Sequence, residues 1–357
     1  MTKMLEGFNV FFDPNKSVAY ASEILVGLGN TKIENEGLVL QHKTQDKRYE
    51  SLSQYVFERD IDVSAEVNSF TSIYIEDFSV DTVFGIWLFF SRRNKEMIPE
   101  NIDLWLIYTN RWEAGDTSTT GKPFESYGCL QNALALKMCN QSPKEILRTS
   151  LFFLDYLIKN NFDPAYIADT IEIPQYLEAR STLNNEYEKY KDIVNRSEVG
   201  IFYMPNSDSK IKTKVSGIFI ETNLVTSIQK VFLRNDEKSP TEDGYAFMAI
   251  YNPFVKGSGN DIVISVDPVK HIHLKALWKE IEKEEELLWN EERPKDNSRP
   301  LVSYPNNNGP NEPWWDDMGN YTLIAAPKMV GDEYGRRLSW KRVKQLIKLL
   351  YAKGAQS

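Results

Sequence analysis

The sequence predicts an α/β protein: an N-terminal, mostly parallel sheet with flanking helices, followed by a smaller α+β domain. In the first half, short β-branched or aromatic runs alternate with helical patterns, which is the arrangement that parallel βαβ units require. From Val199 onward, several strand-like runs follow one another before a long helix. The 357 residues are many for a single core, which favours two domains.

The predicted strands of the first half are short and are followed by polar turns. They are Asn9–Phe12, Leu38–Gln41 and Ser72–Ile75, with Leu104–Tyr108 as a fourth strand. The predicted helices are Ser17–Leu28, Glu50–Arg59, Asp81–Arg92, Leu130–Met138 and Pro143–Lys159. The last of these carries an apolar face at helical spacing.

A long polar helix, Pro174–Val194, is predicted to connect the two domains. The expected boundaries are 1–165 for the α/β domain, 166–198 for the helical linker and 199–357 for the α+β domain. The strands predicted in the second domain are Val199–Met204, Lys214–Glu221, Tyr245–Tyr251, Asp261–Val266 and Tyr321–Ala326. A charged helix at His273–Glu292 and a final helix at Ser339–Ala352 flank a Pro- and Asn-rich loop, and Ser339 is a favourable N-cap.

The net charge, the cysteines and the apolar runs of the chain limit the classes of protein that it could belong to. The formal charge is −9, from 51 acidic and 42 basic residues, which argues against a nucleic-acid binder that relies on overall positive charge. The two cysteines, Cys129 and Cys139, lack metal-ligand spacing and are expected to be free thiols in a reducing compartment. The N-terminus has no signal-peptide pattern, and the apolar run Val83–Phe90 is too short to cross a bilayer. We therefore expect a cytoplasmic protein without a membrane segment.

The main candidate site is the acidic segment that begins at the predicted strand Ser72–Ile75. Glu76, Asp77 and Asp81 follow this strand and lead into an apolar helix. Ligands collect at the carboxyl ends of parallel strands, and carboxylates there can hold Mn²⁺ or Mg²⁺. The alternative is structural, because an acid such as Asp81 near a helix start is stabilised by the helix dipole without any further role.

Glu76, Ser79, Asp81 and Gly85 occupy the positions of a known motif, and the segment resembles the first motif of the DHH phosphoesterase superfamily. That motif is a strand, an acid-rich turn and a small residue that opens a helix. The family has a histidine and two aspartates here, whereas this chain has Glu76 and Ser79 at the first two places, and it contains no Asp-His-His triplet. The resemblance implies either an altered metal site or a catalytically inactive relative.

Two further residues are candidates for catalysis. Lys122 lies in a Gly/Thr/Asp loop, expected at the carboxyl end of the strand Leu104–Tyr108, where it could hold a phosphate while Asp116 joins the metal ligands. The alternative is an ordinary surface loop, since the Walker A spacing is missing. His42 follows the strand Leu38–Gln41 and could act as a ligand or general base, or be a lone exposed histidine.

Two segments of the second half could bind partners. Trp314 and Trp315 stand in the Asn-rich loop, where they could stack on a base, insert into a protein partner or fold back onto the core. The last helix is the most basic part of the chain and could meet phosphates or an acidic protein surface, or be a solvated face. The basic residues in and just before this helix are Arg336, Arg337, Lys341, Arg342, Lys344 and Lys348.

Two functional hypotheses follow from these patterns. The first is a metal-dependent phosphoesterase or nuclease-like hydrolase that acts on a phosphate-containing substrate or nucleotide. In it, Asp77, Asp81 and Asp116, with Glu76, hold Mn²⁺ or Mg²⁺, and His42 assists proton transfer. The second is a non-catalytic binding or scaffold subunit of a multi-protein bacterial assembly such as a defence system. Acids clustered at strand ends favour the first hypothesis, and the missing histidines favour the second.

Overall fold

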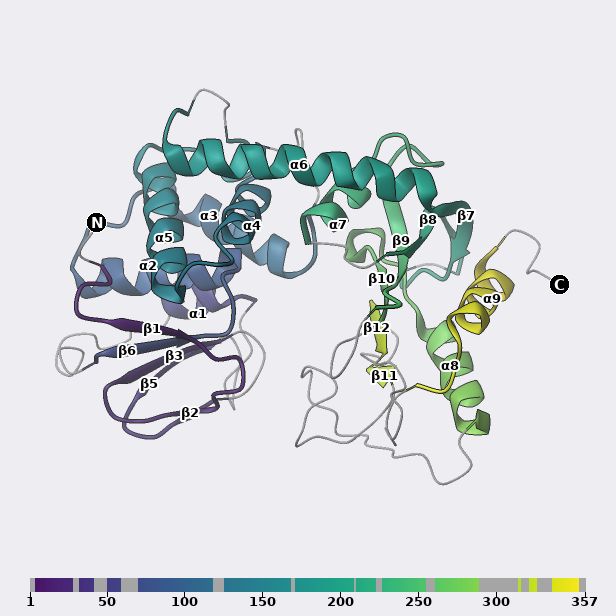
Figure 1. Cartoon of the computed structure of the whole chain (residues 1–357), viewed down its shortest axis with the longest axis horizontal. Helices are drawn as coiled ribbons and strands as arrows, with labels where there is room; N and C mark the ends of the chain where they lie inside the picture. Colours follow the sequence, from purple (N-terminus) through teal and green to yellow (C-terminus); the bar gives the residue numbers. More distant parts are fainter. Residues whose placement is uncertain are drawn as a thin grey trace. The chain divides into compact units, whose positions relative to one another are not determined.

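The computed structural model describes most of the chain, namely residues 4–27, 32–41, 50–58, 70–117, 125–167, 171–208, 210–222, 227–254, 261–288, 314–315, 321–325 and 336–352. The chain divides into two compact units, Met1–Glu186 and Tyr187–Ser357, and the boundary lies inside helix α6 (Pro174–Arg196) (Figure 1). The first unit combines a parallel sheet with helices, and the second contains a mixed sheet with helices, so the predicted α/β fold class is confirmed.

The sheet of the first unit has four parallel strands in the order β1-β6-β3-β5. These strands are β1 (Asn9–Phe12), β3 (Glu23–Gly27), β5 (Leu38–Gln41) and β6 (Ser72–Ile75). The central strands β6 and β3 are in register, with Ile75 opposite Val26, so the residues that follow them meet at the same edge of the sheet. Two short strands, β2 (Val18–Ala19) and β4 (Ile33–Glu34), form a separate parallel pair.

The predicted helix Ser17–Leu28 is wrong, because this segment forms β2 and β3. Ile24, Leu25 and Val26 are all buried. A central strand of a parallel sheet is covered on both faces, so its apolar residues form a continuous run and do not alternate with polar ones. That run was mistaken for one face of a helix.

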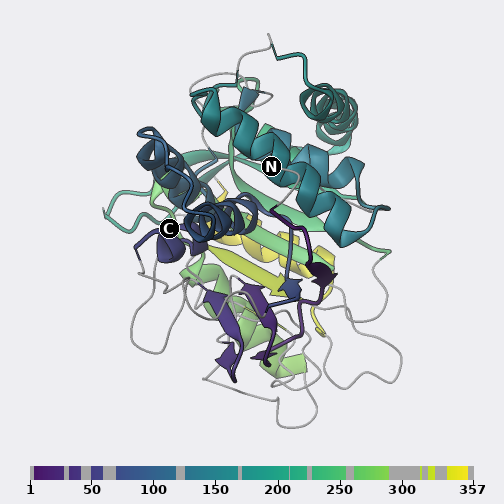
Figure 2. The ribbon, with the colours of Figure 1, turned by 90° about the vertical axis from the view of Figure 1, so that its left-hand side faces the viewer.

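Five helices complete the described part of the first unit before α6. They are α1 (Leu52–Glu58), α2 (Val80–Arg93), α3 (Ile102–Glu113), α4 (Tyr127–Lys137) and α5 (Pro143–Lys159). Helices α1, α2 and α5 lie on one side of the sheet (Figure 1). Figure 2 shows the same layering from a second direction. Helix α2 is buried on nearly all sides, from Val80 to Ser91, and is the centre of this unit.

The predicted strand Leu104–Tyr108 is also wrong, since these residues lie within helix α3. The buried residues of α3 are Ile102, Trp105, Leu106 and Thr109, which is a helical period and not an alternation. The loop that contains Asp116 therefore follows a helix, not a strand.

The second unit is built on a six-stranded sheet in the order β11-β12-β10-β9-β8-β7, antiparallel except for the pair β8 and β9. Its strands are β7 (Glu198–Met204), β8 (Thr213–Glu221), β9 (Tyr245–Tyr251), β10 (Ile262–Val266), β11 (Trp314–Trp315) and β12 (Thr322–Ala325). Its helices are α7 (Ser227–Arg234), α8 (Lys275–Leu288) and α9 (Trp340–Tyr351).

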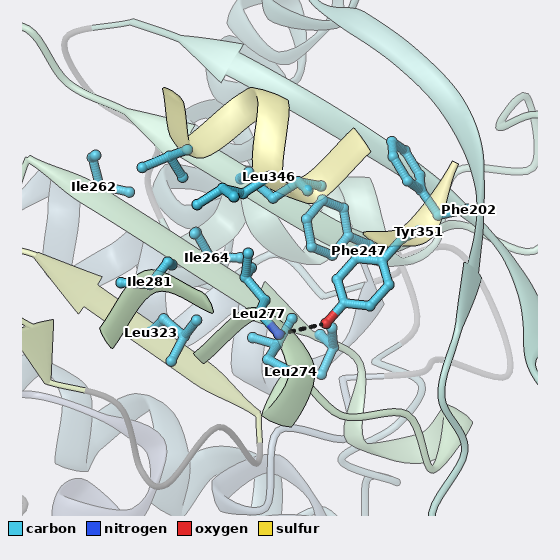
Figure 3. Close-up of a cluster of buried hydrophobic side chains, with 14 of the residues drawn as sticks. Phe202, Phe247, Ile262, Ile264, Leu274, Leu277, Ile281, Leu323, Leu346 and Tyr351 are labelled. Atoms are coloured by element: carbon cyan, nitrogen blue, oxygen red, sulfur yellow. Dashed lines mark hydrogen bonds between the residues drawn. The ribbon is translucent and has the colours of Figure 1, made fainter. Parts of the chain in front are cut away.

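Helices α8 and α9 pack against one face of this sheet through a single apolar core (Figure 3). Phe247 and Ile264 from the strands meet Leu277 of α8 and Leu346 of α9 in this core. The hydroxyl of Tyr351 accepts a hydrogen bond from the Leu277 backbone N–H at 3.1 Å. Ser339 accepts from the Arg342 N–H, which confirms Ser339 as the N-cap of α9.

None of the helices in the described part of the chain combines the length and the hydropathy that crossing a bilayer requires.

Candidate functional site at the edge of the parallel sheet

The carboxyl edge of the parallel sheet contains a buried ion pair. Glu76 directly follows β6, and its Oε1 lies 2.7 Å from the Nζ of Lys32. The Lys32 ammonium also donates to the Lys16 carbonyl at 2.7 Å, and Lys32 as a whole is only 5% exposed. Glu76 is thus held at the predicted place by a cation from the segment between β3 and β5.

The ends of β3 and β5 position Lys32. The backbone of Lys32 forms two hydrogen bonds with the Gln41 side chain, one from its N–H (2.7 Å) and one to its carbonyl (3.3 Å). Gly27, the last residue of β3, leaves room for the ion pair, because a Cβ there would be 2.8 Å from the Glu76 carboxyl carbon and closer still to Lys32. Sequence analysis missed Lys32, since a single lysine in a short connection carries no pattern; the only signals are Gly27 and Gln41 at the strand ends.

Asp77 fixes the turn before helix α2. Its Oδ1 accepts hydrogen bonds from the Ser79 N–H (2.9 Å) and from the Thr82 hydroxyl (2.6 Å). Ser79 is the N-cap of α2 and accepts from the Thr82 N–H at 3.2 Å. This combination of an Asp turn and an N-cap provides acceptors for the N–H groups of Ser79 and Thr82 at the helix start.

Asp81 is fully buried and binds the start of a different helix. It lies in the first turn of α2, yet its two carboxylate oxygens accept from the N–H groups of Leu52 (2.6 Å) and Ser53 (2.8 Å) at the start of α1. A seven-residue helix is too short to be stable by itself, so α1 depends on such contacts. Helix α2 approaches α1 closely at Gly85, where a Cβ would be 2.9 Å from Leu52 Cγ.

A second group of hydrogen bonds ties the start of α1 to α3. The Ser51 hydroxyl accepts from the Gln54 N–H (3.0 Å) and donates to the Asn110 side chain (2.5 Å). Asn110 in turn donates to the Gln54 side chain at 3.0 Å. Asp81, Ser51 and Asn110 together join helices α1, α2 and α3.

Two acids in this region, Asp81 and Glu113, have raised pKa values. Burial raises the pKa of Asp81 to about 6, against the hydrogen bonds from Ser53 and Leu52, and the charge of Asp77 adds to the rise. Burial also raises the pKa of Glu113, at the end of α3, and the charges of Asp81 and Asp77 raise it further. Glu113 is therefore a third acid in the environment of Asp77 and Asp81. Sequence analysis missed it because the segment before it was assigned to a strand.

The remaining candidate residues are elsewhere or outside the described residues. Asp116 follows α3 and pairs with Arg111 of the same helix, with 2.7 Å between its Oδ2 and the guanidinium. Its predicted place at a strand end is therefore wrong, although its part in binding stays untested. His42 and Lys122 lie outside the described residues, in 42–49 and 118–124.

The donor set can be compared with what a divalent cation needs. Mg²⁺ and Mn²⁺ require several carboxylate or carbonyl oxygens at one point. Glu76, Asp77, Asp81 and Asp116 already accept from an ammonium, a hydroxyl, backbone N–H groups and a guanidinium. Within the described ranges, no three His, Cys, Asp or Glu side chains are grouped to hold a metal ion. The carboxylates in this arrangement do not fit a resident metal without giving up some of these contacts.

Trp314 and several basic residues of the C-terminal region make contacts within the second unit. Trp314 is buried, and its Nε1 donates to Glu285 at 3.0 Å, so internal packing is confirmed for this tryptophan; the side chain of Trp315 is outside the described part. Several basic groups of the C-terminal region pair with acids of the same unit. These pairs are Arg336–Asp261, Arg342–Glu284, Lys344–Glu198 and Lys348–Glu198.

Comparison with known proteins adds no assignment: no family model, no curated protein and no solved structure matches this chain. The similarity to the DHH motif therefore depends on Glu76, Ser79, Asp81 and Gly85 alone.

Proposed function

We propose that this chain is a non-catalytic binding or scaffold protein that works inside a multi-protein assembly. In this proposal, the acids at the edge of the parallel sheet hold the first unit together. The observation that carries the proposal is the position of Asp81, which is fully buried with both oxygens accepting from the N–H groups of α1. A carboxylate used in this way stabilises the fold and is poorly placed to exchange ligands with solvent.

The contacts of the other acids support the same proposal. Glu76 is paired with the buried Lys32, and Asp77 is part of the N-terminal turn of α2. These contacts give the acid-rich turn a structural role that does not require the histidines of the DHH motif.

A metal-dependent phosphoesterase is the second candidate, and one observation favours it. Asp77 and Asp81 are close enough to Glu113 for their negative charges to raise its pKa. A bound Mn²⁺ or Mg²⁺ would relieve the repulsion between these acids. No reaction step is assigned here, since the contacts described above do not leave a complete ligand set.

Thermal unfolding in Mn²⁺, Mg²⁺ or EDTA separates the two candidates. A ligand that binds the native state alone raises the melting temperature as its concentration rises. We expect wild type and Asp77→Asn to melt at temperatures that do not depend on the cation. Asparagine keeps the Oδ1 that accepts from Ser79 and Thr82, so this variant removes the charge without removing the turn. A rise in wild type that Asp77→Asn abolishes would support the phosphoesterase instead.

The scaffold proposal has its own test, which is purification of the chain at native abundance from its own cells. We expect it to co-purify with other proteins in fixed proportion. Recovery of the chain alone, under mild salt, would contradict the proposal.

A further inference from the structure

The second unit contains two basic residues that are one helical turn apart and partly buried. Lys230 and Arg234 lie four residues apart on α7 and therefore share one face of this helix. The apolar face of α7 anchors the helix, since Ile228, Val231 and Phe232 are buried. The helix that carries Lys230 and Arg234 is therefore held in place against the rest of the unit.

The guanidinium of Arg234 is anchored on the sheet. One of its nitrogens donates to the Tyr245 carbonyl at 2.8 Å, and another donates to the Ser265 hydroxyl at 3.3 Å. Burial lowers the pKa of Arg234 to about 10, while the charge of Asp267 opposes this change. Arg234 therefore remains a cation at neutral pH, held in a fixed orientation.

Lys230 lacks a counter-charge in the described part of the chain. It makes no hydrogen bond there, and neither Lys230 nor Arg234 forms an ion pair within that part. Burial lowers the pKa of Lys230, and the nearby positive charge of Arg234 lowers it further. Partly buried charges are normally paired, because desolvation without a partner is unfavourable. An anion between the two side chains would offset this penalty.

One hydroxyl group, that of Ser265, bonds to Arg234, and a second lies on the neighbouring strand. Ser265 of β10 is directly opposite Thr322 of β12, so both side chains project from the same face of the sheet. Ser265 bonds to Arg234, which identifies this as the face that α7 covers. The core residues Ile264 and Val266 alternate with Ser265 and project to the opposite face, towards α8 and α9. Ser265 and Thr322 are both only partly buried.

We propose that Lys230, Arg234, Ser265 and Thr322 form a binding site for the phosphate group of a small ligand. Two cations and two hydroxyls supply several donors to a tetrahedral dianion, and Arg and Lys are the side chains that bind phosphate in proteins. A long polyanion is disfavoured, since the chain carries a net charge of −9. The site belongs to the second unit alone and does not depend on the acids of the first unit.

The test is thermal unfolding of the full chain in inorganic phosphate, with chloride at equal ionic strength as the reference. At phosphate ten times its dissociation constant, the melting temperature of the second unit should rise by roughly 3–6 °C. Lys230→Met should lose this rise, and it should fold normally because Lys230 donates no hydrogen bond in the described structure. The matched control is Lys238→Met, an exposed lysine four residues beyond Arg234, which should retain the rise.

Thermal unfolding with other ligands identifies the source of the phosphate. A nucleoside monophosphate that shifts the melting temperature more than phosphate does, while the nucleoside has no effect, would identify a nucleotide ligand. Equal shifts would show recognition of the phosphate group alone. The proposal is overturned if phosphate acts no more strongly than chloride, or if Lys230→Met or Lys230→Gln responds as wild type does.

Discussion

Replacing Asp81 by alanine removes the acceptor for two buried N–H groups at the start of helix α1. Leu52 and Ser53 donate to its two oxygens at 2.6 and 2.8 Å. A buried donor left without its acceptor costs about 1–3 kcal/mol, and loss of a desolvated charge offsets part of this. We therefore expect Asp81→Ala to lower the free energy of unfolding by roughly 2–3 kcal/mol at pH 7. In a unit of this size, that corresponds to a melting temperature lower by about 5–10 °C.

The pH dependence of this loss is a sharper test than its size. In the folded protein, burial raises the pKa of Asp81 from 3.8 to about 6. The folded state therefore binds the proton more tightly than the unfolded state does. Its contribution to stability is fully present below pH 3.8 and is lost as the pH rises through 6. Between pH 7 and pH 5, wild type should gain about 1 kcal/mol from this group, which the alanine variant cannot gain.

Urea unfolding followed by circular dichroism at pH 7 and pH 5 measures both quantities. Asp103→Ala is the matched control, since Asp103 is an exposed aspartate in the first turn of α3 and its loss should change stability by less than about 0.5 kcal/mol. The difference between wild type and Asp81→Ala should widen toward pH 5. An aspartate with an ordinary or lowered pKa stays ionised in both states between pH 7 and pH 5, so its contribution would not change over this range. A difference that stays constant or narrows toward pH 5 would therefore refute the structural role assigned to Asp81.

Three other substitutions have defined outcomes in the same urea assay. Glu76→Gln leaves the buried Lys32 ammonium without its counter-charge and should cost about 3–5 kcal/mol. Glu113→Gln should gain stability relative to wild type as the pH rises above 4.5, because a raised pKa means that ionised Glu113 disfavours the folded state. Gly85→Ala places a methyl group 2.9 Å from Leu52 Cγ and should cost about 1–3 kcal/mol through overpacking of α1 against α2.

Controls make these outcomes decisive. Glu145→Gln breaks an exposed pair with Arg148 and should cost less than about 1 kcal/mol, so an equal cost for Glu76→Gln would show that burial of the Lys32 pair adds nothing. A Glu113→Gln variant that is less stable than wild type at pH 8 would show that ionised Glu113 has a favourable partner. Gly85→Ala at wild-type stability would mean that α1 and α2 separate without penalty.

The sequence predicted those elements whose hydrophobic pattern has a single interpretation. Helix Pro143–Lys159 and strand Tyr245–Tyr251 have the predicted boundaries, because a serine cap precedes the helix and turn residues bound the strand. The segments 17–28 and 104–108 were assigned wrongly. In both, an apolar run is compatible with a helix or with a buried strand, and tertiary packing decides between them. Helix α7 was missed because it has only eight residues, which is too short for an apolar periodicity to stand out in the sequence.

The position of the acidic segment in the fold was predicted, but the contacts of its side chains were not. Glu76 and Asp77 follow β6 at the sheet edge, as the strand-turn-helix pattern indicates. The partners of these acids could not be predicted, since Lys32 and the N–H groups of α1 come from segments far away in sequence. Asp81 shows the limit most clearly: its place in the first turn of α2 is a local property, whereas its binding to α1 depends on how the two helices pack.

The measurement that tests the central claim most directly is Mn²⁺ binding, followed by the electron paramagnetic resonance signal of free Mn²⁺ in a titration of the full chain. If the sheet-edge acids are structural, wild type, Asp77→Asn and Glu113→Gln should all bind Mn²⁺ equally weakly. The remaining weak binding would come from exposed carboxylates elsewhere on the surface. Stoichiometric binding by wild type that both substitutions abolish, in variants that remain folded, would contradict it.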